Sequence, residues 1–308
     1  MAMKLEGIHH ITAITAEAQR NVDFYADLLG LRLVKKTVNQ DQPSVYHLFY
    51  ADEEGDPGSD LTFFEFPGVP PGRPGAGMVY RIGWRVGSPQ ALDFWAERLE
   101  RAGYPSTRDG DRLRFADFEG LEHELVVSEV DDQALIADHP DVPAEMALQG
   151  FDFARAYSAD PERSRERLEQ TLEFESRDGG WEARGARRGG LYAYDEPPPE
   201  SGRQGAGSVH HIAWASLPYD HEAWRDRVAE AGLNPTPIID RYYFRSIYFR
   251  EPSGVLFEIA TIGPGFAVDE SADHLGESLA LPPFLEDMRE EIEPILTPIE
   301  NPRTKTRA

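Results

Sequence analysis

The chain has no cysteine. This absence excludes disulfide bonds, thiolate metal ligands and cysteine nucleophiles, so any metal must bind imidazole or oxygen ligands. Long hydrophobic runs are also absent, because no segment has the roughly 20 apolar residues that a transmembrane helix needs. The first residues, Met1 to Ile8, lack the apolar core of a signal peptide. We therefore expect a cytoplasmic enzyme that does not associate with membranes.

Basic residues are few. The chain has 31 lysines and arginines against 55 acidic residues, a net charge of −24, and only four of the basic residues are lysines. Contact with phosphate requires a basic surface, so a nucleic-acid partner is not expected. Two interpretations of the acidic, lysine-poor composition stay open: adaptation to a salt-rich cytoplasm, or a GC-rich genome that favours arginine.

The tripeptide His-His-Ile occurs twice, at residues 9–11 and 210–212. Each copy follows a branched apolar residue and leads into a mostly apolar run, which is typical of a strand. With 308 residues the chain is long enough for two domains or for repeats. A repeated strand that carries a metal-binding side chain indicates an internally duplicated fold with one shared metal site.

Both His-His-Ile strands precede a predicted helix that ends at a glycine. Gly30 follows His10 by 20 positions, and Gly232 follows His211 by 21. Two weaker copies of the same pattern begin near Arg81 and Phe151, and strand-rich sequence follows each helix. We therefore predict an α+β fold of four similar modules, each a strand, a helix and about three strands, and set aside a coincidence of generic patterning.

Proline-rich and glycine-rich segments separate these modules. They predict an N-terminal domain of modules one and two over residues 1–135, and a C-terminal domain of modules three and four over residues 136–265. A helical extension and tail would follow over residues 266–308. In that extension we expect a helix from Phe284 to about Glu293, with Phe284, Met288 and Ile292 on the side that packs against the modules.

A carboxylate lies in the middle of the last apolar strand, at Glu258. Burying it is costly unless it is paired, hydrogen-bonded or bound to a metal. Histidine occupies the first strand of a module only in modules one and four, which makes His10, His211 and Glu258 one complete set of ligands. Two imidazoles and one carboxylate with open positions form the facial triad of non-haem Fe(II) oxygen chemistry. Mn(II), Zn(II) and Ni(II) suit the same ligands.

Within each His-His pair, successive strand residues face opposite sides, so one ring of each pair should point at the metal. The pattern fixes only that both ligands come from the same position of the pair; we choose the second, His10 and His211, and expect His9 and His210 beside the site at a bent strand end or behind the sheet. Glu65 lies at a place that looks equivalent to Glu258, which leaves it three interpretations: a fourth ligand, an acceptor behind the ligands, or a solvated edge residue. The remaining histidines have no repeated partner and are assigned structural roles: His47, His123, His139, His221 and His274.

The sequence resembles the vicinal oxygen chelate superfamily, which includes glyoxalase I and the extradiol dioxygenases, and within it the hydroquinone-type ring-cleaving dioxygenases. The resemblance implies paired βαβββ modules in two tandem domains, with curved mixed sheets around a metal cavity. It also implies Fe(II), or sometimes Mn(II), on His10, His211 and Glu258. The segments that carry the resemblance are Gly7–Thr12, Phe24–Asn39, Val45–Leu48, Val209–Ala213, Asp240–Thr261, Gly265–Asp269 and His274–Glu277.

The same resemblance implies that five further residues line the substrate pocket: His9, Thr12, His210, Arg241 and Tyr248. The hypothesis that follows is cleavage of a dihydroxylated aromatic ring by O2. Arg241 would stabilise an oxyanion, and His210 or Tyr248 would move protons.

Two other functions stay open. One is a glyoxalase-like lyase or isomerase with Glu65 as fourth ligand and Zn(II) or Ni(II) as the metal; the other is a metal-free protein that binds an aromatic ligand. The sequence does not choose between para- and ortho-diols, and it leaves a homo-oligomer open.

Overall fold

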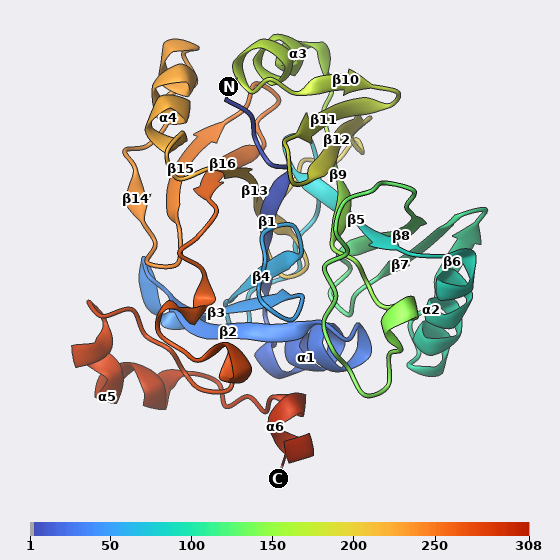
Figure 1. The fold of residues 1–308 in the computed structure, drawn as a ribbon, viewed down its shortest axis with the longest axis vertical. Coiled ribbons are helices and arrows are strands. Elements are labelled where there is room, and N and C mark those ends of the chain that lie inside the picture. Colours follow the sequence, from blue (N-terminus) through green and yellow to red (C-terminus); the bar gives the residue numbers. More distant parts are fainter. Residues whose placement is uncertain (1–2, 308) are drawn as a thin grey trace.

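Four modules of the predicted kind follow one another along the chain (Figure 1). The structure, a computed structural model, describes residues 3–307, with side chains described as far as Thr304. Modules one and two consist of β1 (Ile8–Thr15), α1 (Ala18–Val22), β2 (Arg32–Asn39), β3 (Gln42–Ala51), β4 (Asp60–Glu65), β5 (Val79–Val86), α2 (Pro89–Arg101), β6 (Ser106–Asp109), β7 (Arg112–Ala116) and β8 (Glu122–Val127).

Modules three and four repeat this order, and a C-terminal extension follows them. The second pair consists of β9 (Phe151–Tyr157), α3 (Glu162–Glu166), β10 (Glu175–Arg177), β11 (Gly180–Arg184), β12 (Gly189–Asp195), β13 (Val209–Ser216), α4 (His221–Glu230), β14 (Ile239–Asp240), β15 (Arg245–Arg250) and β16 (Leu256–Thr261). The extension contains 3-10 turns and the short helices α5 (Arg289–Ile292) and α6 (Pro302–Arg307).

The strands form two mixed, eight-stranded sheets, which confirms the predicted fold class. The first sheet has the order β14-β15-β16-β13-β1-β4-β3-β2, and the second β10-β11-β12-β9-β5-β8-β7-β6. The first sheet therefore joins module four to module one, and the second joins module three to module two. Each sheet takes one module from each half of the chain, whereas the proposed domain boundaries follow the sequence and stay a prediction.

The helices form for the reasons that the sequence indicates. Ser88 caps α2 by accepting a hydrogen bond from the Ala91 N–H, Pro89 occupies the first turn, and Leu92, Trp95 and Leu99 are buried. Helix α1 continues as a π-helical turn over Asp23–Leu28, and Gly30 then adopts a φ of +70°, where a side chain would be strained.

The central strands of both sheets carry β-bulges at corresponding places. In the pairing of β1 with β13 the register shifts between Ile8 and His10 and between Thr12 and Ala13, so that His9 and His210 are the extra residues. In the pairing of β5 with β9 the extra residues are Tyr80 and Asp152. The bulges thus belong to the module pairing itself, and only the first sheet places histidines in them.

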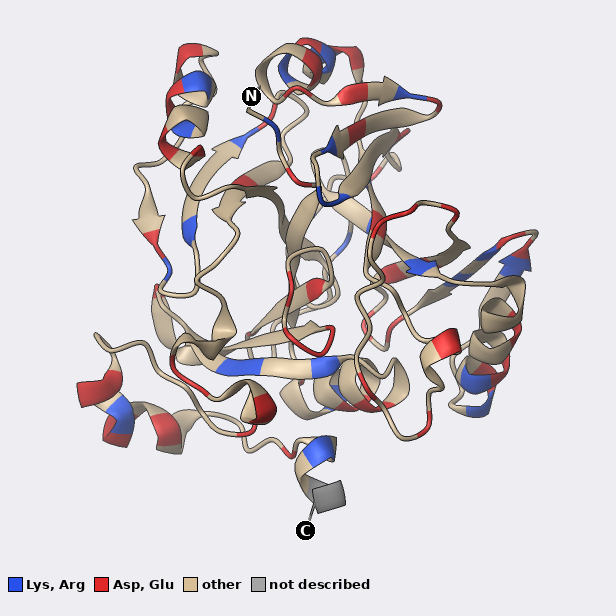
Figure 2. Ribbon diagram, viewed as in Figure 1, with Lys and Arg blue, Asp and Glu red and all other residues tan. Residues whose placement is uncertain are grey.

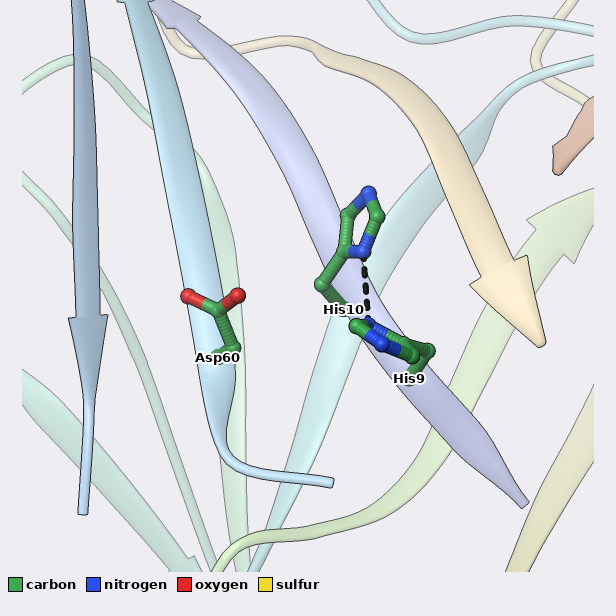
Figure 3. Close-up of side chains that lie close together, drawn as sticks. All are labelled: His9, His10 and Asp60. Carbon is green, nitrogen blue, oxygen red and sulfur yellow. Dashed lines mark hydrogen bonds between the residues drawn. The ribbon is translucent and has the colours of Figure 1, made fainter. Parts of the chain in front are cut away.

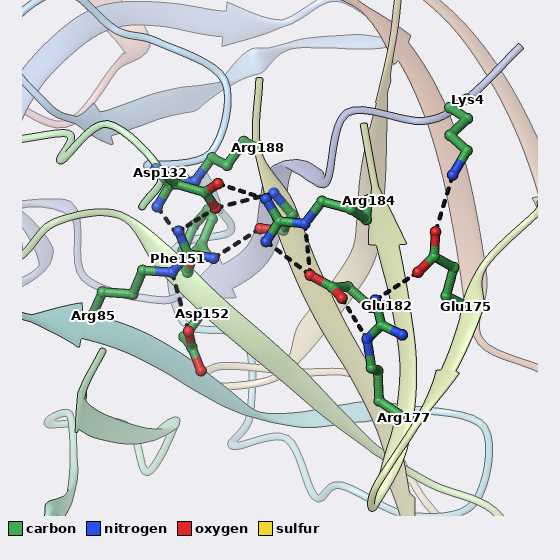
Figure 4. Close-up of polar contacts among 11 residues, drawn as sticks. Lys4, Arg85, Asp132, Phe151, Asp152, Glu175, Arg177, Glu182, Arg184 and Arg188 are labelled. Carbon is green, nitrogen blue, oxygen red and sulfur yellow. Dashed lines mark hydrogen bonds and ion pairs between the residues drawn. The ribbon is translucent and has the colours of Figure 1, made fainter. Parts of the chain in front are cut away.

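An ion-pair network fastens the connection between the two halves of the chain to the second sheet (Figure 4). Asp132 of this connection accepts hydrogen bonds from Arg85 of β5 and Arg184 of β11, and Arg184 also bonds Glu182. From Glu182 the network continues through Arg177 and Glu175 to Lys4.

The C-terminal extension lies along β2, the edge strand of the first sheet (Figure 1). Lys36 of β2 forms a bridge with Leu279, and a Cβ on Gly276 would lie 1.9 Å from the Leu33 carbonyl oxygen, so only glycine allows this approach. The extension therefore covers strand groups that would otherwise be free to pair with another chain.

One buried cation holds this extension. The Lys35 ammonium, which is 0% exposed, donates to the Phe266 carbonyl oxygen at 3.0 Å, to Asp269 at 2.6 Å and to Glu270. Tyr243, which approaches the metal site described below, also donates to Asp269, at 2.9 Å.

The predicted helix at Phe284 is only partly correct. Helical turns cover Glu286–Ile295, but they are a mixture of 3-10 and α geometry. Ile292 is buried, whereas Phe284 is 60% exposed and Met288 41% exposed, so the expected apolar side does not pack against the modules. The physical reason is that Leu281 and Leu285, next to this segment in the chain, are the residues buried in the hydrophobic core.

Acidic side chains are spread over loops and helices throughout the molecule, with lysine and arginine between them (Figure 2). This distribution agrees with both interpretations of the composition. Among the described residues, no helix combines the length and the apolar character needed to cross a bilayer.

Lys35→Met should lower the free energy of unfolding by about 3–5 kcal/mol, because it leaves two carboxylates without their buried cation. The matched control is Lys4→Met, which removes the exposed Lys4–Glu175 pair and should cost less than about 1 kcal/mol. Urea titrations of the two variants measure both values. Equal losses would show that the Lys35 cluster contributes no more than a surface pair.

Candidate metal site

Three strands of the first sheet bring the predicted ligands together. His10 lies on β1, His211 on β13 and Glu258 on β16, and these strands are neighbours in the sheet. Glu258 pairs with Ala213, two residues beyond His211, so its side chain emerges on the same face as His211. The pairing of β1 with β13 thus joins residues from opposite ends of the chain.

The three side chains meet at one point. His10 Nε2 lies 3.2 Å from His211 Nε2 and 3.2 Å from Glu258 Oε2, and His211 Nε2 lies 2.9 Å from Glu258 Oε2. Adjacent ligand atoms on an octahedral metal with bonds of about 2.1 Å lie roughly 3.0 Å apart. All three side chains are at most 4% exposed. The residues therefore fit one divalent metal ion bound by three adjacent ligands.

The first histidine of each pair lies behind the second. His9 Nδ1 is 2.9 Å from His10 Nδ1, and His210 Nδ1 is 2.8 Å from His211 Nδ1. A ring that binds a metal through Nε2 carries its proton on Nδ1, so each ligand can donate to its neighbour. His9 Nε2 can then donate to the Thr261 carbonyl oxygen at 3.2 Å. This arrangement gives the paired histidines two roles: one ring of each pair is placed to bind a metal, and the bulged ring is placed to orient it.

Protonation in the site also suits a metal. Burial lowers the pKa of His211, and burial and the nearby His10 lower the pKa of His9 to about 3. Burial alone would raise the pKa of Glu258, but His10 and His211 outweigh it and hold that pKa well below its usual value. Neutral imidazole and ionised carboxylate are the forms that bind metals. With both Nε2 atoms unprotonated, Glu258 Oε2 has no hydrogen-bond donor among the described residues.

The fourth-ligand interpretation of Glu65 needs correction. Glu65 pairs with Thr15, and its Oε1 accepts hydrogen bonds from the Ala18 N–H at 3.1 Å and the Thr297 hydroxyl at 2.9 Å. The residue that matches Glu258 by register is Thr62, which pairs with Thr12, two residues beyond His10. Glu65 lies three residues farther along β4 than this position, and it joins module one to the C-terminal extension.

A small cavity that is open to solvent lies beside the triad. The predicted Arg241 and Tyr248 lie on its wall, with the Arg241 guanidinium 5.5 Å from the centre of the Tyr248 ring. Burial and Glu258 raise the pKa of Tyr248 above its usual value, so this phenol keeps its proton at neutral pH. The wall residues are His10, Thr37, Val38, Asn39, Gln40, Asp41, His47, Phe49, Phe64, His211, Arg241, Tyr243, Phe244 and Tyr248.

The other predicted pocket residues are not among those that line the cavity. His9 is buried behind His10, as Figure 3 shows, and His210 is exposed behind His211. Thr12 is buried and forms a 2.8 Å hydrogen bond with Thr62. Their predicted roles in catalysis and substrate binding stay predictions, but their contacts are those of residues that support the ligands and the wall.

Two residues near the site were not identified from the sequence. Asp60 of β4 pairs with His10 of β1 (Figure 3), and its carboxyl oxygens have no hydrogen-bond partner among the described residues. Burial raises the pKa of Asp60 well above its usual value. Asp60 is the first residue of β4 and follows a turn, so it lacks the apolar flanks that singled out Glu258. His47 lines the cavity, although it has no repeated partner and was assigned a structural role.

The geometry can now be compared with known proteins. The sequence pattern of the Glyoxalase/Bleomycin resistance protein/Dioxygenase superfamily matches residues 7–120 and 150–259. The chain belongs to this superfamily. The two matched segments correspond to modules one and two and to modules three and four, and they contain all three residues of the triad.

Curated relatives and a solved structure match nearly the whole chain. "Putative ring-cleaving dioxygenase MhqA" of Bacillus subtilis is 41% identical over 323 residues, which cover 97% of this chain and 100% of MhqA. "Chlorohydroquinone/hydroquinone 1,2-dioxygenase" of Sphingobium indicum is 34% identical over 313 residues, covering 94% and 95%. A crystal structure of a "putative dioxygenase" from Bacillus subtilis has a TM-score of 0.90 and 40% identity, covering 97% of this chain and 99% of that one.

The ligand assignment predicts that His211→Ala and Glu258→Gln each lower metal content from about one ion per chain to less than about a tenth, because two ligands do not retain the ion. Glu65→Gln should keep full occupancy, and so should His274→Ala, whose ring is 62% exposed. Metal analysis of the folded variants provides the measurement. Full occupancy in His211→Ala, or loss of metal in Glu65→Gln, would contradict the assignment.

Proposed function

We propose that the protein is a non-haem Fe(II)-dependent dioxygenase that cleaves the ring of a dihydroxylated aromatic of the hydroquinone type with O2. The observation that carries this proposal is the convergence of two imidazole nitrogens and one carboxylate oxygen within 3.2 Å beside a cavity. Two imidazoles and a carboxylate leave the open positions that oxygen chemistry on iron requires. The names of relatives that are 34% and 41% identical over nearly the whole chain support the same reaction.

The residues around the metal site would bind the substrate and transfer protons to it. When bound, Fe(II) would supply open coordination positions and one-electron chemistry with O2. Arg241 keeps its charge at any physiological pH and can stabilise negative charge that develops on a substrate oxygen. Tyr248 keeps its proton and can donate it to a leaving or product oxygen. The aromatic rings of Phe49, Phe64 and Phe244 give the cavity the apolar surface that an aromatic ring requires.

The glyoxalase-like alternative receives no support from the register, because Thr62 stands where a fourth carboxylate would be needed. A metal-free binding protein would not require two imidazole nitrogens and a buried carboxylate oxygen to converge on one point. The metal identity is a separate question, since Mn(II), Zn(II) and Ni(II) accept the same ligands.

The proposal predicts oxygen consumption when anaerobically purified, Fe(II)-loaded protein is given hydroquinone, with one O2 used per ring opened. An oxygen electrode measures the uptake, and mass spectrometry identifies the ring-opened product. Catechol in parallel distinguishes para- from ortho-diols, and methylglyoxal with glutathione tests the lyase alternative. The dioxygenase proposal fails if the iron-loaded protein consumes no oxygen with either diol.

Tyr248→Phe should lower kcat about 100-fold while metal content stays near one ion per chain, because only the phenolic proton donor is removed. Tyr219→Phe is the matched control: its side chain is 79% exposed, and the variant should keep the wild-type kcat. Steady-state oxygen uptake and metal analysis on the same preparations test this. An unchanged kcat in Tyr248→Phe would remove Tyr248 from proton transfer.

A further inference from the structure

The internal repeat assigns Glu258 a counterpart in module one. Ala213, two residues after His211, pairs with Glu258, and Thr12, two residues after His10, pairs with Thr62. Thr62 is therefore the counterpart of Glu258 in module one. A short neutral hydroxyl stands where a symmetric site would have a second carboxylate.

His47 stands behind this short residue, on the cavity wall. In module four, the Ser246 hydroxyl of β15 donates a hydrogen bond to Glu258. His47 of β3 occupies the strand position in module one that Ser246 occupies in module four. The His47 ring forms a 2.9 Å hydrogen bond with Thr62, the counterpart of Glu258. Thr62 is in turn 2.8 Å from Thr12. The hydrogen bonds Thr12–Thr62–His47 thus run across three adjacent strands and end at a ring that faces the cavity.

The ring of His47 is held firmly. Its centre lies 3.9 Å from that of Phe49 and 4.4 Å from that of Phe64, and both phenylalanines also line the cavity. Its hydrogen-bond partner is a neutral hydroxyl, so no carboxylate bonded to it favours a charged ring. A fixed, neutral imidazole next to two phenyl rings is suited to bind one hydroxyl of an aromatic ligand that lies between apolar surfaces.

Three other polar residues of the wall have contacts of their own. Arg241 pairs with Asp41 at 3.0 Å, Tyr243 donates to Asp269, and Tyr248 lies next to Glu258 in the strand register. The neighbouring oxygens of an ortho-diol can both be held at the metal. The second oxygen of a para-diol lies on the opposite side of its ring and requires a polar group away from the triad.

We propose that His47 binds the hydroxyl of a para-diol that does not contact the metal, and so sets the preference for hydroquinones over catechols. This inference rests on the proposed function. His47 acts as a substrate-binding residue, and Thr62 and Thr12 act as positioning residues that fix the direction of its ring.

Two variants test this role. His47→Ala should raise the KM for hydroquinone about 10- to 100-fold, because the bound hydroxyl loses its partner, while the KM for catechol changes less than about threefold. Thr62→Val keeps the shape of the side chain and removes only the hydroxyl that holds His47, so it should raise the same KM by a smaller factor. Both variants should keep about one metal ion per chain. His274→Ala is the control and should match the wild type with both substrates.

The outcomes separate this inference from the proposed function. If the wild type consumes oxygen with hydroquinone and His47→Ala leaves its KM unchanged, or raises both KM values equally, His47 does not recognise the second hydroxyl. If the wild type consumes no oxygen with either diol, the proposed function fails. Anaerobic calorimetry with hydroquinone then still tests whether His47 binds the hydroxyl. His47→Ala should raise the Kd for hydroquinone about 10- to 100-fold, and equal Kd values for this variant and the wild type would overturn the role.

Discussion

The antiparallel pairing of β1 with β13 is the contact on which the site depends. It places His10 next to His211, although 201 residues separate them in the sequence, and it brings β16 with Glu258 to the same place. The bulges in this pairing allow two consecutive histidines to approach one another on each strand. A regular ladder would send alternate side chains to opposite faces, and the rings that orient the ligands would then lie on the wrong side of the sheet.

The sequence was sufficient for the modules and the triad because their signals are local. His-His-Ile, the helix-ending glycines and a carboxylate in an apolar strand can each be recognised within a few residues. Glu65 was misjudged because Phe-Glu-Phe resembles the strand around Glu258, whereas the equivalence of two positions depends on hydrogen-bond register, which is a property of the folded sheet. The shared histidines predicted that modules one and four meet at one site, whereas the direct pairing of β1 with β13 in one sheet was not predicted.

Residues with supporting roles were the hardest to assign. His9 and His210 were expected beside the site or behind the sheet, and the bulges give that expectation a geometric cause. His47 was set aside because it has no counterpart histidine, yet its strand position corresponds to that of Ser246, so the repeat conserves the place and changes the side chain. The C-terminal helix was predicted from an apolar spacing that the chain leaves largely exposed at Phe284 and Met288.

The interleaving of the modules has a consequence for how the molecule is made. Because the first sheet takes its central strands from the first and last modules, β1 emerges from the ribosome long before β13 and β16 exist to pair with it. Modules two and three can form the second sheet before module four is synthesised. Until then one side of β1 stays unpaired, and an unpaired strand edge favours aggregation. The candidate metal site is therefore among the last parts of the protein to be completed, and a chain truncated before Glu258 could form the second sheet but would lack one residue of the triad.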